Sequence, residues 1–256
     1  MISMDFNADL GEGFGVYSYG GDEALIPLVT SANIACGWHG GDPGVMRRAV
    51  RLALENGVTI GAHPGYPDRL GFGRRNMSIS AQDVEDLILY QIGALDGLCR
   101  AEGTCVRYVK PHGALYNTAA TDPSLAAAVV RAVKSYGGLS LLCPGGSAMA
   151  AEAEKAGVHT AYEFFADRSY RDDGSLMPRT EPGAVISDFP TICARVLRAL
   201  REGVVETSSG KQILVRVDSV CLHGDHPEAV TIAEKLRQKI LEAGVEIRPF
   251  ETGEEP

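Results

Sequence analysis

The sequence predicts an α/β protein, an irregular (β/α) barrel with seven strands. Two observations lead to this fold. Segments of β-type residues alternate with amphipathic helical segments along the chain, which is typical of parallel βαβ units. Seven such units are more than a simple doubly wound sheet usually contains, so closure into a barrel is favoured. The expected strands span residues 2–9, 32–36, 59–62, 107–112, 139–143, 160–165 and 219–223.

The segments between these strands carry helix start signals. Side chains of Asp and Ser accept backbone hydrogen bonds at N-cap positions, and proline fits the first helical turn. In the second of the helices that these signals predict, the polar Gln91 interrupts an otherwise apolar face. The expected starts are Asp42-Pro43, Ser80 with Asp83, Asp122-Pro123 and Pro227, and the last helix is expected to end near Gly244.

Length and loop pattern indicate the domain organisation. A chain of 256 residues can bury a large core, and without a linker or repeat we expect one domain over residues 1–256. Residues 64–76 and 166–183 are too long for simple turns, and loops of this length are usually lids or binding loops. Both follow strands, so we expect both to lie over the same face of the barrel.

Charge and composition exclude several classes of function. A net charge of −9 argues against nucleic acid as a partner, because binding to nucleic acid needs a basic face. No apolar run reaches the roughly 20 residues of a membrane span, and residues 1–5 lack the features of a secretion signal. The six cysteines form no C-x-x-C pair. We therefore expect reduced thiols, a cytoplasmic location and no membrane partner.

Four of the six histidines stand where a β-type segment breaks into glycine or Pro-Gly. Strand ends converge on a shared cleft in such folds, and glycine allows a sharp turn and the close approach of a ligand. These residues are His39, His63, His112 and His223. His159 precedes a strand and is expected at the opposite rim, and His226 is expected at a helix start.

Alternation along the strands predicts which side chains face the barrel interior. Residues two apart share a face, so Asp5, Asn7 and Asp9 are expected on one side of the first strand. The same pattern brings Tyr108, Lys110 and His112 together, then Glu163, Phe165 and Asp167, and finally Ser219, Cys221 and His223. A structural interpretation also exists, in which Lys110 simply neutralises Asp5 or Asp9.

The residue types alone do not select one chemistry. Neutral histidines and carboxylates bind divalent metals, and they also serve in acid–base catalysis near neutral pH. No H-E-x-x-H motif, nucleophile elbow or complete P-loop is present. Gly145-Gly146-Ser147 is a weak candidate for an anion cradle. Loop arginines that could bind phosphate or carboxylate are Arg74, Arg75, Arg168 and Arg179.

Long motifs over nearly the whole chain resemble those of the LamB/YcsF family. Ala8 stands where the family commonly has cysteine, and Trp38 where it commonly has phenylalanine. The motifs are DFNADLGE at residues 5–12, SANIACGWH at 31–39, GAHPGYPD at 61–68, GFGRR at 71–75, KPHGALYN at 110–117, FADR at 165–168, PGAV at 182–185 and HGD at 223–225.

The resemblance implies a barrel similar to those of glycoside hydrolases and deacetylases. It also implies a component of a bacterial ATP-dependent 5-oxoprolinase, which opens the 5-oxoproline lactam to L-glutamate with ATP as co-substrate and works with two partner subunits, B and C. Under this hypothesis Asp9 or His63 is the general base, and His112 or Lys110 stabilises the oxyanion. The residues expected to bind substrate or phosphate are Asn7, Glu12, His39, Arg74, Glu163, Arg168 and His223.

Two other hypotheses stay open at the level of sequence. The chain could be a metal-dependent amidase or deacetylase that acts alone, with Asp9, His39 and His63 holding a divalent metal. It could also be a non-catalytic subunit that binds substrate or docks its partners. An ATP requirement counts against the first hypothesis, and hydrolysis by the chain alone excludes the second.

Overall fold

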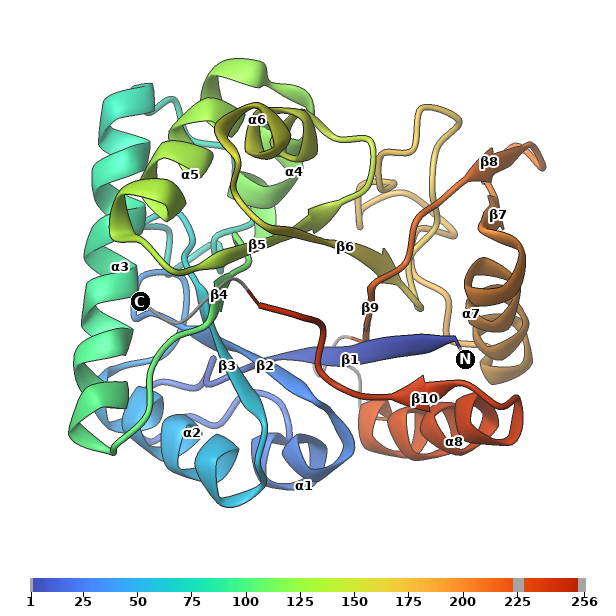
Figure 1. Ribbon diagram of the computed structural model, residues 1–256, viewed down its shortest axis with the longest axis horizontal. Coiled ribbons are helices and arrows are strands. Elements are labelled where there is room, and N and C mark those ends of the chain that lie inside the picture. The colour runs from blue at the N-terminus through green and yellow to red at the C-terminus, as the bar shows by residue number, and fades with distance from the viewer. Residues whose placement is uncertain (1, 223–227, 253–256) are drawn as a thin grey trace.

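A computed structural model describes residues 2–222 and 228–252, with a closed parallel barrel at its centre (Figure 1). The barrel strands pair in chain order, and the last of them pairs with the first, so the ring closes. The predicted seven-stranded (β/α) barrel is therefore confirmed. The strands are β1 (Ser3–Leu10), β2 (Ser31–Ala35), β3 (Thr59–His63), β4 (Tyr108–Val109), β5 (Ser140–Pro144), β6 (Thr160–Phe165) and β9 (Ser219–Cys221).

Within residues 2–222 and 228–252, three short strands lie outside this ring, and they were not expected from the sequence. β7 (Val204–Glu206) and β8 (Gln212–Leu214) form an antiparallel hairpin. β10 (Glu246–Ile247) pairs with the start of β1, whereas β9 pairs with the following residues of β1. β1 thus changes its partner along its length, and the C-terminal segment covers the beginning of the barrel.

Helices surround the strands on the outside (Figure 1). The predicted N-caps are confirmed, because the side chains of Asp42, Ser80 and Asp122 accept backbone hydrogen bonds from the first helical turns. The helices are α1 (Asp22–Leu25), η1 (Ile26–Leu28), α2 (Pro43–Glu55), α3 (Ala81–Ala101), α4 (Gly113–Thr121), α5 (Pro123–Tyr136), α6 (Ala148–Ala156), α7 (Phe189–Glu202) and α8 (Ala229–Glu242). The predicted start of the last helix at Pro227 lies outside the described residues.

The fourth strand is shorter than the predicted 107–112, because α4 begins directly after His112. The segment nevertheless keeps the path of a strand. The amide of Lys110 donates to the carbonyl of Ala62, and that of His112 donates to the carbonyl of Pro64, at 2.9 and 2.8 Å. Lys110 and His112 therefore still point to the side expected from alternation with Tyr108.

β1 illustrates how the barrel divides its residues. Met4, Phe6, Ala8 and Leu10 are buried in the hydrophobic core between strands and helices. The alternate side chains face the barrel interior, where they make polar contacts. The predicted split of this strand into an apolar and a polar face is confirmed. The interior is thus polar, and its groups must find partners within it.

The two long loops leave the barrel at the ends of β3 and β6. Gln91, the polar break in the apolar face of α3, is buried and fixes the first loop. Its side chain accepts from the amide of Gly65 and donates to the carbonyl of Gly65, both at 3.0 Å. Among the described residues, no helix is long and apolar enough to span a membrane.

Candidate active site in the barrel mouth

The polar interior begins with a carboxyl group near the start of the strands. Asp5 is fully buried and accepts hydrogen bonds from the hydroxyls of Thr30 at 2.6 Å and Ser31 at 2.7 Å. The hydroxyl of Ser219 donates to its other oxygen. Burial raises the pKa of Asp5 to about 6, although these hydrogen bonds act in the opposite direction.

A layer of amides lies above Asp5. The side-chain amide of Asn7 donates to Ser219 Oγ at 2.7 Å, and that of Asn33 donates to Asn7 Oδ1 at 2.8 Å and to Asp9 Oδ1 at 2.9 Å. The hydroxyl of Tyr108 donates to Asn33 Oδ1 at 2.7 Å. These contacts link four strands and hold the Asp9 carboxylate at the next level of the interior.

Lys110 is buried at the centre of this next level. Its Nζ lies 2.9 Å from Asp9 Oδ1 and 2.7 Å from Glu163 Oε1. It also donates to Cys221 Sγ at 3.2 Å and to Asn7 Oδ1 at 3.3 Å. Burial alone would lower the pKa of Lys110, but the Asp9 carboxylate and its other acidic neighbours raise it well above the usual value. Lys110 is therefore a fixed cation at neutral pH and unsuited to act as a base.

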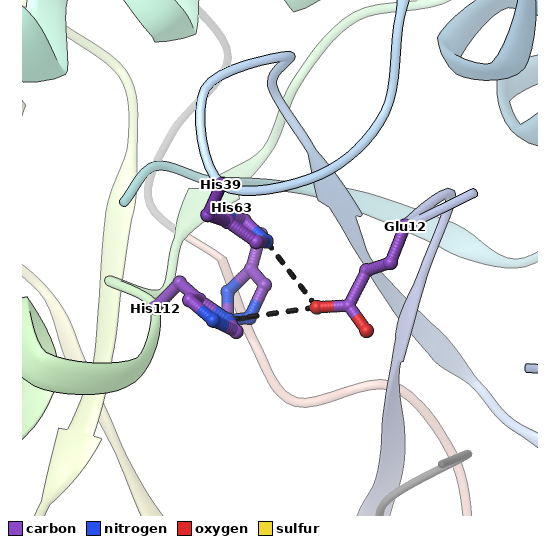
Figure 2. A group of neighbouring side chains, drawn as sticks. All are labelled: Glu12, His39, His63 and His112. Atoms are coloured by element: carbon purple, nitrogen blue, oxygen red, sulfur yellow. Dashed lines mark hydrogen bonds and ion pairs between the residues drawn. The ribbon is translucent and has the colours of Figure 1, made fainter. Parts of the chain in front are cut away.

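Three histidines and one glutamate converge at the rim above Lys110 (Figure 2). One ligand atom of each of Glu12, His39, His63 and His112 lies within 4.8 Å of all the others. Glu12 Oε1 lies 3.2 Å from His39 Nε2 and 3.5 Å from His112 Nδ1. We call these four residues the His–Glu cluster.

The rings of the cluster are tightly packed. The imidazoles of His39 and His112 stack with centroids 3.6 Å apart, and His63 meets His112 edge-on. Burial and neighbouring positive charge lower the pKa values of His39 and His112 well below the usual range. Both rings are therefore neutral at physiological pH, with a lone pair available on one nitrogen each.

Glycines allow this packing, which gives a structural reason for the histidine–glycine pattern. A Cβ on Gly65 would lie 2.7 Å from His39 Nδ1, and a Cβ on Gly73 would lie 2.8 Å from His112 Cδ2. A Cβ on Gly40 would come within 3.0 Å of the Glu12 carbonyl oxygen. Larger residues at Gly65 and Gly73 would push the rings apart, and one at Gly40 would displace the Glu12 backbone.

A cavity of about 480 Å³ opens beside these groups. Its wall includes Asp9, His63, Lys110 and His112 from the ends of the strands. His63 Nε2 lies 3.4 Å from Asp9 Oδ2, so the cluster and the Lys110 level are in direct contact. The cavity thus exposes a carboxylate, a fixed cation and two imidazoles to a small molecule.

The long loops contribute arginines to the same cavity. Arg74 comes from the loop after β3, and Arg168 and Arg179 come from the loop after β6. Arg168 is buried and donates to the carbonyls of Ala184 and Met177. Burial, with the charge of Arg179 nearby, lowers its pKa to about 10, so it stays charged at neutral pH. This side of the cavity suits a carboxylate or phosphate.

Several residues predicted for the site do not line this cavity. Arg75 forms an ion pair with Asp68, and His159 hydrogen-bonds Ser140 Oγ at 3.1 Å before β6, away from the cavity. His223 and His226 lie outside the described residues. Of the metal ligands expected from the sequence, His39 and His63 belong to the His–Glu cluster, whereas Asp9 lies beside it and binds Lys110.

Three contacts of the site had not been inferred from the sequence. Phe72 supplies a backbone carbonyl 2.9 Å from His112 Nε2, and the hydroxyl of Tyr116 donates to Glu163 Oε2 at 2.7 Å. Asn33 lies in the interior between β1 and β4. Only Asn33 had a readable signal, because Ser31 and Asn33 alternate as the polar residues of β1 do.

Comparisons with known proteins agree with this architecture. The sequence profile of the LamB/YcsF family matches residues 4–255. A protein described as the A subunit of 5-oxoprolinase, from Bacillus subtilis (strain 168), is 49% identical over 96% of each chain. A protein of the same description from Pyrococcus abyssi (strain GE5 / Orsay) is 48% identical over 97% of this chain and 98% of its own.

Solved structures extend the likeness to the fold. The lactam utilization protein from Thermus thermophilus superposes with a TM-score of 0.92 and 46% identity, covering 97% of this chain and 100% of that one. A polysaccharide deacetylase from Bacillus cereus reaches a TM-score of 0.50 at 11% identity, covering 96% of this chain and 92% of its own. The second likeness concerns the fold alone, and it agrees with the expected similarity to deacetylase barrels.

Proposed function

The chain belongs to the LamB/YcsF family, and from this premise we propose that it is the A subunit of a 5-oxoprolinase. The observation that carries the proposal is the identity of 46–50% over nearly the full length of proteins described by that name. The proposed reaction opens the 5-oxoproline lactam to L-glutamate. ATP and two partner subunits, B and C, belong to the proposal, as does a cytoplasmic location, with which six free thiols agree.

The chemistry of the lactam explains why the reaction would use ATP. The five-membered lactam is an unstrained amide that resonance stabilises against attack by water. Phosphorylation of the amide oxygen would convert it into a better electrophile. The cavity suits such a substrate, because Arg74, Arg168 and Arg179 offer positive charge to its carboxylate or to a phosphate.

We assign the reacting groups by their surroundings. Asp9 lies at the cavity wall, where it can take a proton from the attacking water, and His63 beside it is the alternative base as long as no metal occupies its Nε2. Lys110 is a fixed cation and is assigned to the developing oxyanion, with His112 at the adjacent rim. Asn7 and Glu163 orient Lys110 and Asp9, and His39 and Glu12 hold the neighbouring His112.

A reconstitution experiment tests the proposed activity. The chain is combined with the two partner subunits, and glutamate formation and ATP hydrolysis are measured with 5-oxoproline present. We expect both activities to require the chain. We also expect Lys110→Met to lower turnover at least a hundredfold, which corresponds to about 3 kcal/mol of transition-state stabilisation.

The exposed Lys155 provides the matched control. Lys155→Met removes the same charge from a surface ion pair with Glu152 and should leave turnover within about twofold of the unsubstituted chain. Normal turnover by Lys110→Met, or glutamate formation without the chain, would contradict the proposal.

A second candidate function is hydrolysis of an amide by this chain alone with a bound metal. The convergence of three histidines and a glutamate beside the cavity favours it. ATP-independent hydrolysis of 5-oxoproline by the isolated chain would select this function. A third candidate, a subunit that only binds substrate or docks partners, predicts that Lys110→Met leaves the assembled activity unchanged.

A further inference from the structure

Hydrogen bonds to the backbone fix the proton positions on two rings of the His–Glu cluster. His63 Nδ1 lies 2.7 Å from the carbonyl oxygen of Lys110, and His112 Nε2 lies 2.9 Å from that of Phe72. A carbonyl oxygen only accepts, so each of these nitrogens carries a proton. In the neutral rings, the lone pairs are therefore on His63 Nε2 and His112 Nδ1.

These two lone pairs face each other. His63 Nε2 and His112 Nδ1 are 2.9 Å apart, and both side chains are buried. Two acceptors at this distance repel unless a positive charge lies close to both. A metal ion would supply that charge while leaving both rings neutral.

Three of the six ligand-atom distances in the cluster are close to those expected between ligands of one ion. Two ligand atoms each about 2.05 Å from a metal are separated by about 2.9 Å at a right angle and about 3.3 Å at a tetrahedral angle. The cluster shows 2.9 Å between the two histidine nitrogens and 3.2 Å between His39 Nε2 and Glu12 Oε1. The distance from Glu12 Oε1 to His112 Nδ1 is 3.5 Å.

The remaining groups also agree with a cation. Among the described residues, His39 Nδ1 is a buried atom without a hydrogen-bond partner, whereas His39 Nε2 already faces Glu12 Oε1 at 3.2 Å. The ring lies parallel to that of His112, so it must tilt for both imidazoles to direct a lone pair at one ion. Glu12 and the adjacent Asp9 provide two carboxylates, which balance a divalent charge. Phe72 has a φ of +54°, a costly conformation for a bulky residue, while its carbonyl holds His112.

We propose that His39, His63, His112 and Glu12 form a binding site for a divalent transition-metal ion, with zinc as the first choice. Three imidazoles and one carboxylate suit zinc and its first-row neighbours, whereas magnesium and calcium prefer oxygen ligands alone. His63 and His112 line the cavity, so the ion borders the space where a substrate carbonyl or water would lie. Its role in catalysis rests on the proposed function, but binding of the ion does not.

Metal binding by the full chain tests the inference directly. The purified protein is freed of metal with a chelator and titrated with Zn²⁺ by calorimetry, and with Co²⁺ by visible absorption. We expect one ion per chain. His63→Ala and His112→Ala should weaken binding at least about a hundredfold, and Glu12→Gln at least about tenfold. Glu12→Gln keeps the side-chain volume and serves if either alanine variant fails to fold by circular dichroism.

His159→Ala is the matched control, because His159 lies before β6, away from the cluster. It should bind the ion as the unsubstituted chain does. The inference is overturned if the unsubstituted chain binds neither ion, or if the cluster variants bind as tightly as His159→Ala. If the chain bound the metal but the reconstituted assembly had no 5-oxoprolinase activity, the proposed function would be overturned and the metal site would stand. If the metal-free protein were fully active, the proposed function would stand and the ion would have no catalytic role.

Discussion

Asp5 shows how a single buried carboxyl links the barrel interior to pH. Its neighbours are hydroxyl groups, with the Glu163 carboxylate as the charged group that also raises its pKa. The folded-state pKa of about 6 exceeds the ordinary value of 3.8 for an accessible carboxyl. The folded protein therefore binds this proton more tightly than the unfolded chain does.

The sign of the pH dependence follows from this difference. Between about pH 4 and pH 6 the folded state holds more protons than the unfolded state, so the Asp5 contribution to stability falls as the pH rises. At pH 7 the buried charge costs about 3 kcal/mol of unfolding free energy, from roughly two pKa units. We expect Asp5→Asn to become more stable relative to the unsubstituted protein as the pH rises through this range.

Urea denaturation at several pH values between 4 and 7 measures this effect. The difference in unfolding free energy between Asp5→Asn and the unsubstituted chain should grow by up to about 3 kcal/mol. An equal substitution at the exposed Asp86, which bonds Gln82, controls for the exchange of a surface carboxyl for an amide. A constant difference for Asp5→Asn across this range would contradict the raised pKa of Asp5.

At the scale of elements, α3 positions the loop that carries part of the site. Gln91 holds both the amide and the carbonyl of Gly65, two residues after His63. Gln91→Leu keeps the volume but leaves these two buried backbone groups without partners. We expect a loss of about 2–6 kcal/mol of unfolding free energy, at about 1–3 kcal/mol for each unsatisfied group.

The exposed Gln82 of the same helix gives the comparison. Gln82→Leu removes a surface hydrogen bond to Asp86 and should change the unfolding free energy by less than about 0.5 kcal/mol. Urea denaturation of both variants measures the difference. Equal effects at the two positions would mean that the Gly65 contacts do not stabilise the loop.

These elements also indicate what sequence patterns can predict. Alternation in β1 predicted the inward positions of Asp5, Asn7 and Asp9, because each side chain of a strand points to one of only two faces. Gln91 was visible as a break, but its partner was not, since Gly65 is distant in sequence. The contact of Phe72 could not be predicted, because its carbonyl is a group that every residue has. β10 has two residues, too few for any period to appear.

At the scale of the whole molecule, the C-terminal segment closes one end of the barrel. β10 pairs with the start of β1, and Phe250 packs edge-on against Tyr108 with ring centroids 5.1 Å apart. Phe250→Ala removes this packing far from the cavity. We expect a loss of about 2 kcal/mol of unfolding free energy and unchanged turnover of the assembled enzyme.

Leu70 is a suitable control because its side chain is 96% exposed. Leu70→Ala should leave thermal and urea stability unchanged, whereas Phe250→Ala should lower both. If Phe250→Ala were as stable as Leu70→Ala, packing of the C-terminal segment would not contribute to the stability of the barrel.

Buried polar side chains fill the barrel interior from Asp5 to Lys110, and this restricts the route that a substrate can take to the site. The cavity beside Asp9, His63 and Lys110 is lined by residues of both long loops, so a substrate that reaches these groups would pass between the loops. Within the proposed assembly, a partner subunit that transfers an activated intermediate would have to bind over this entrance to the cavity. The exchange of substrate and product would then depend on the dissociation or movement of that partner subunit.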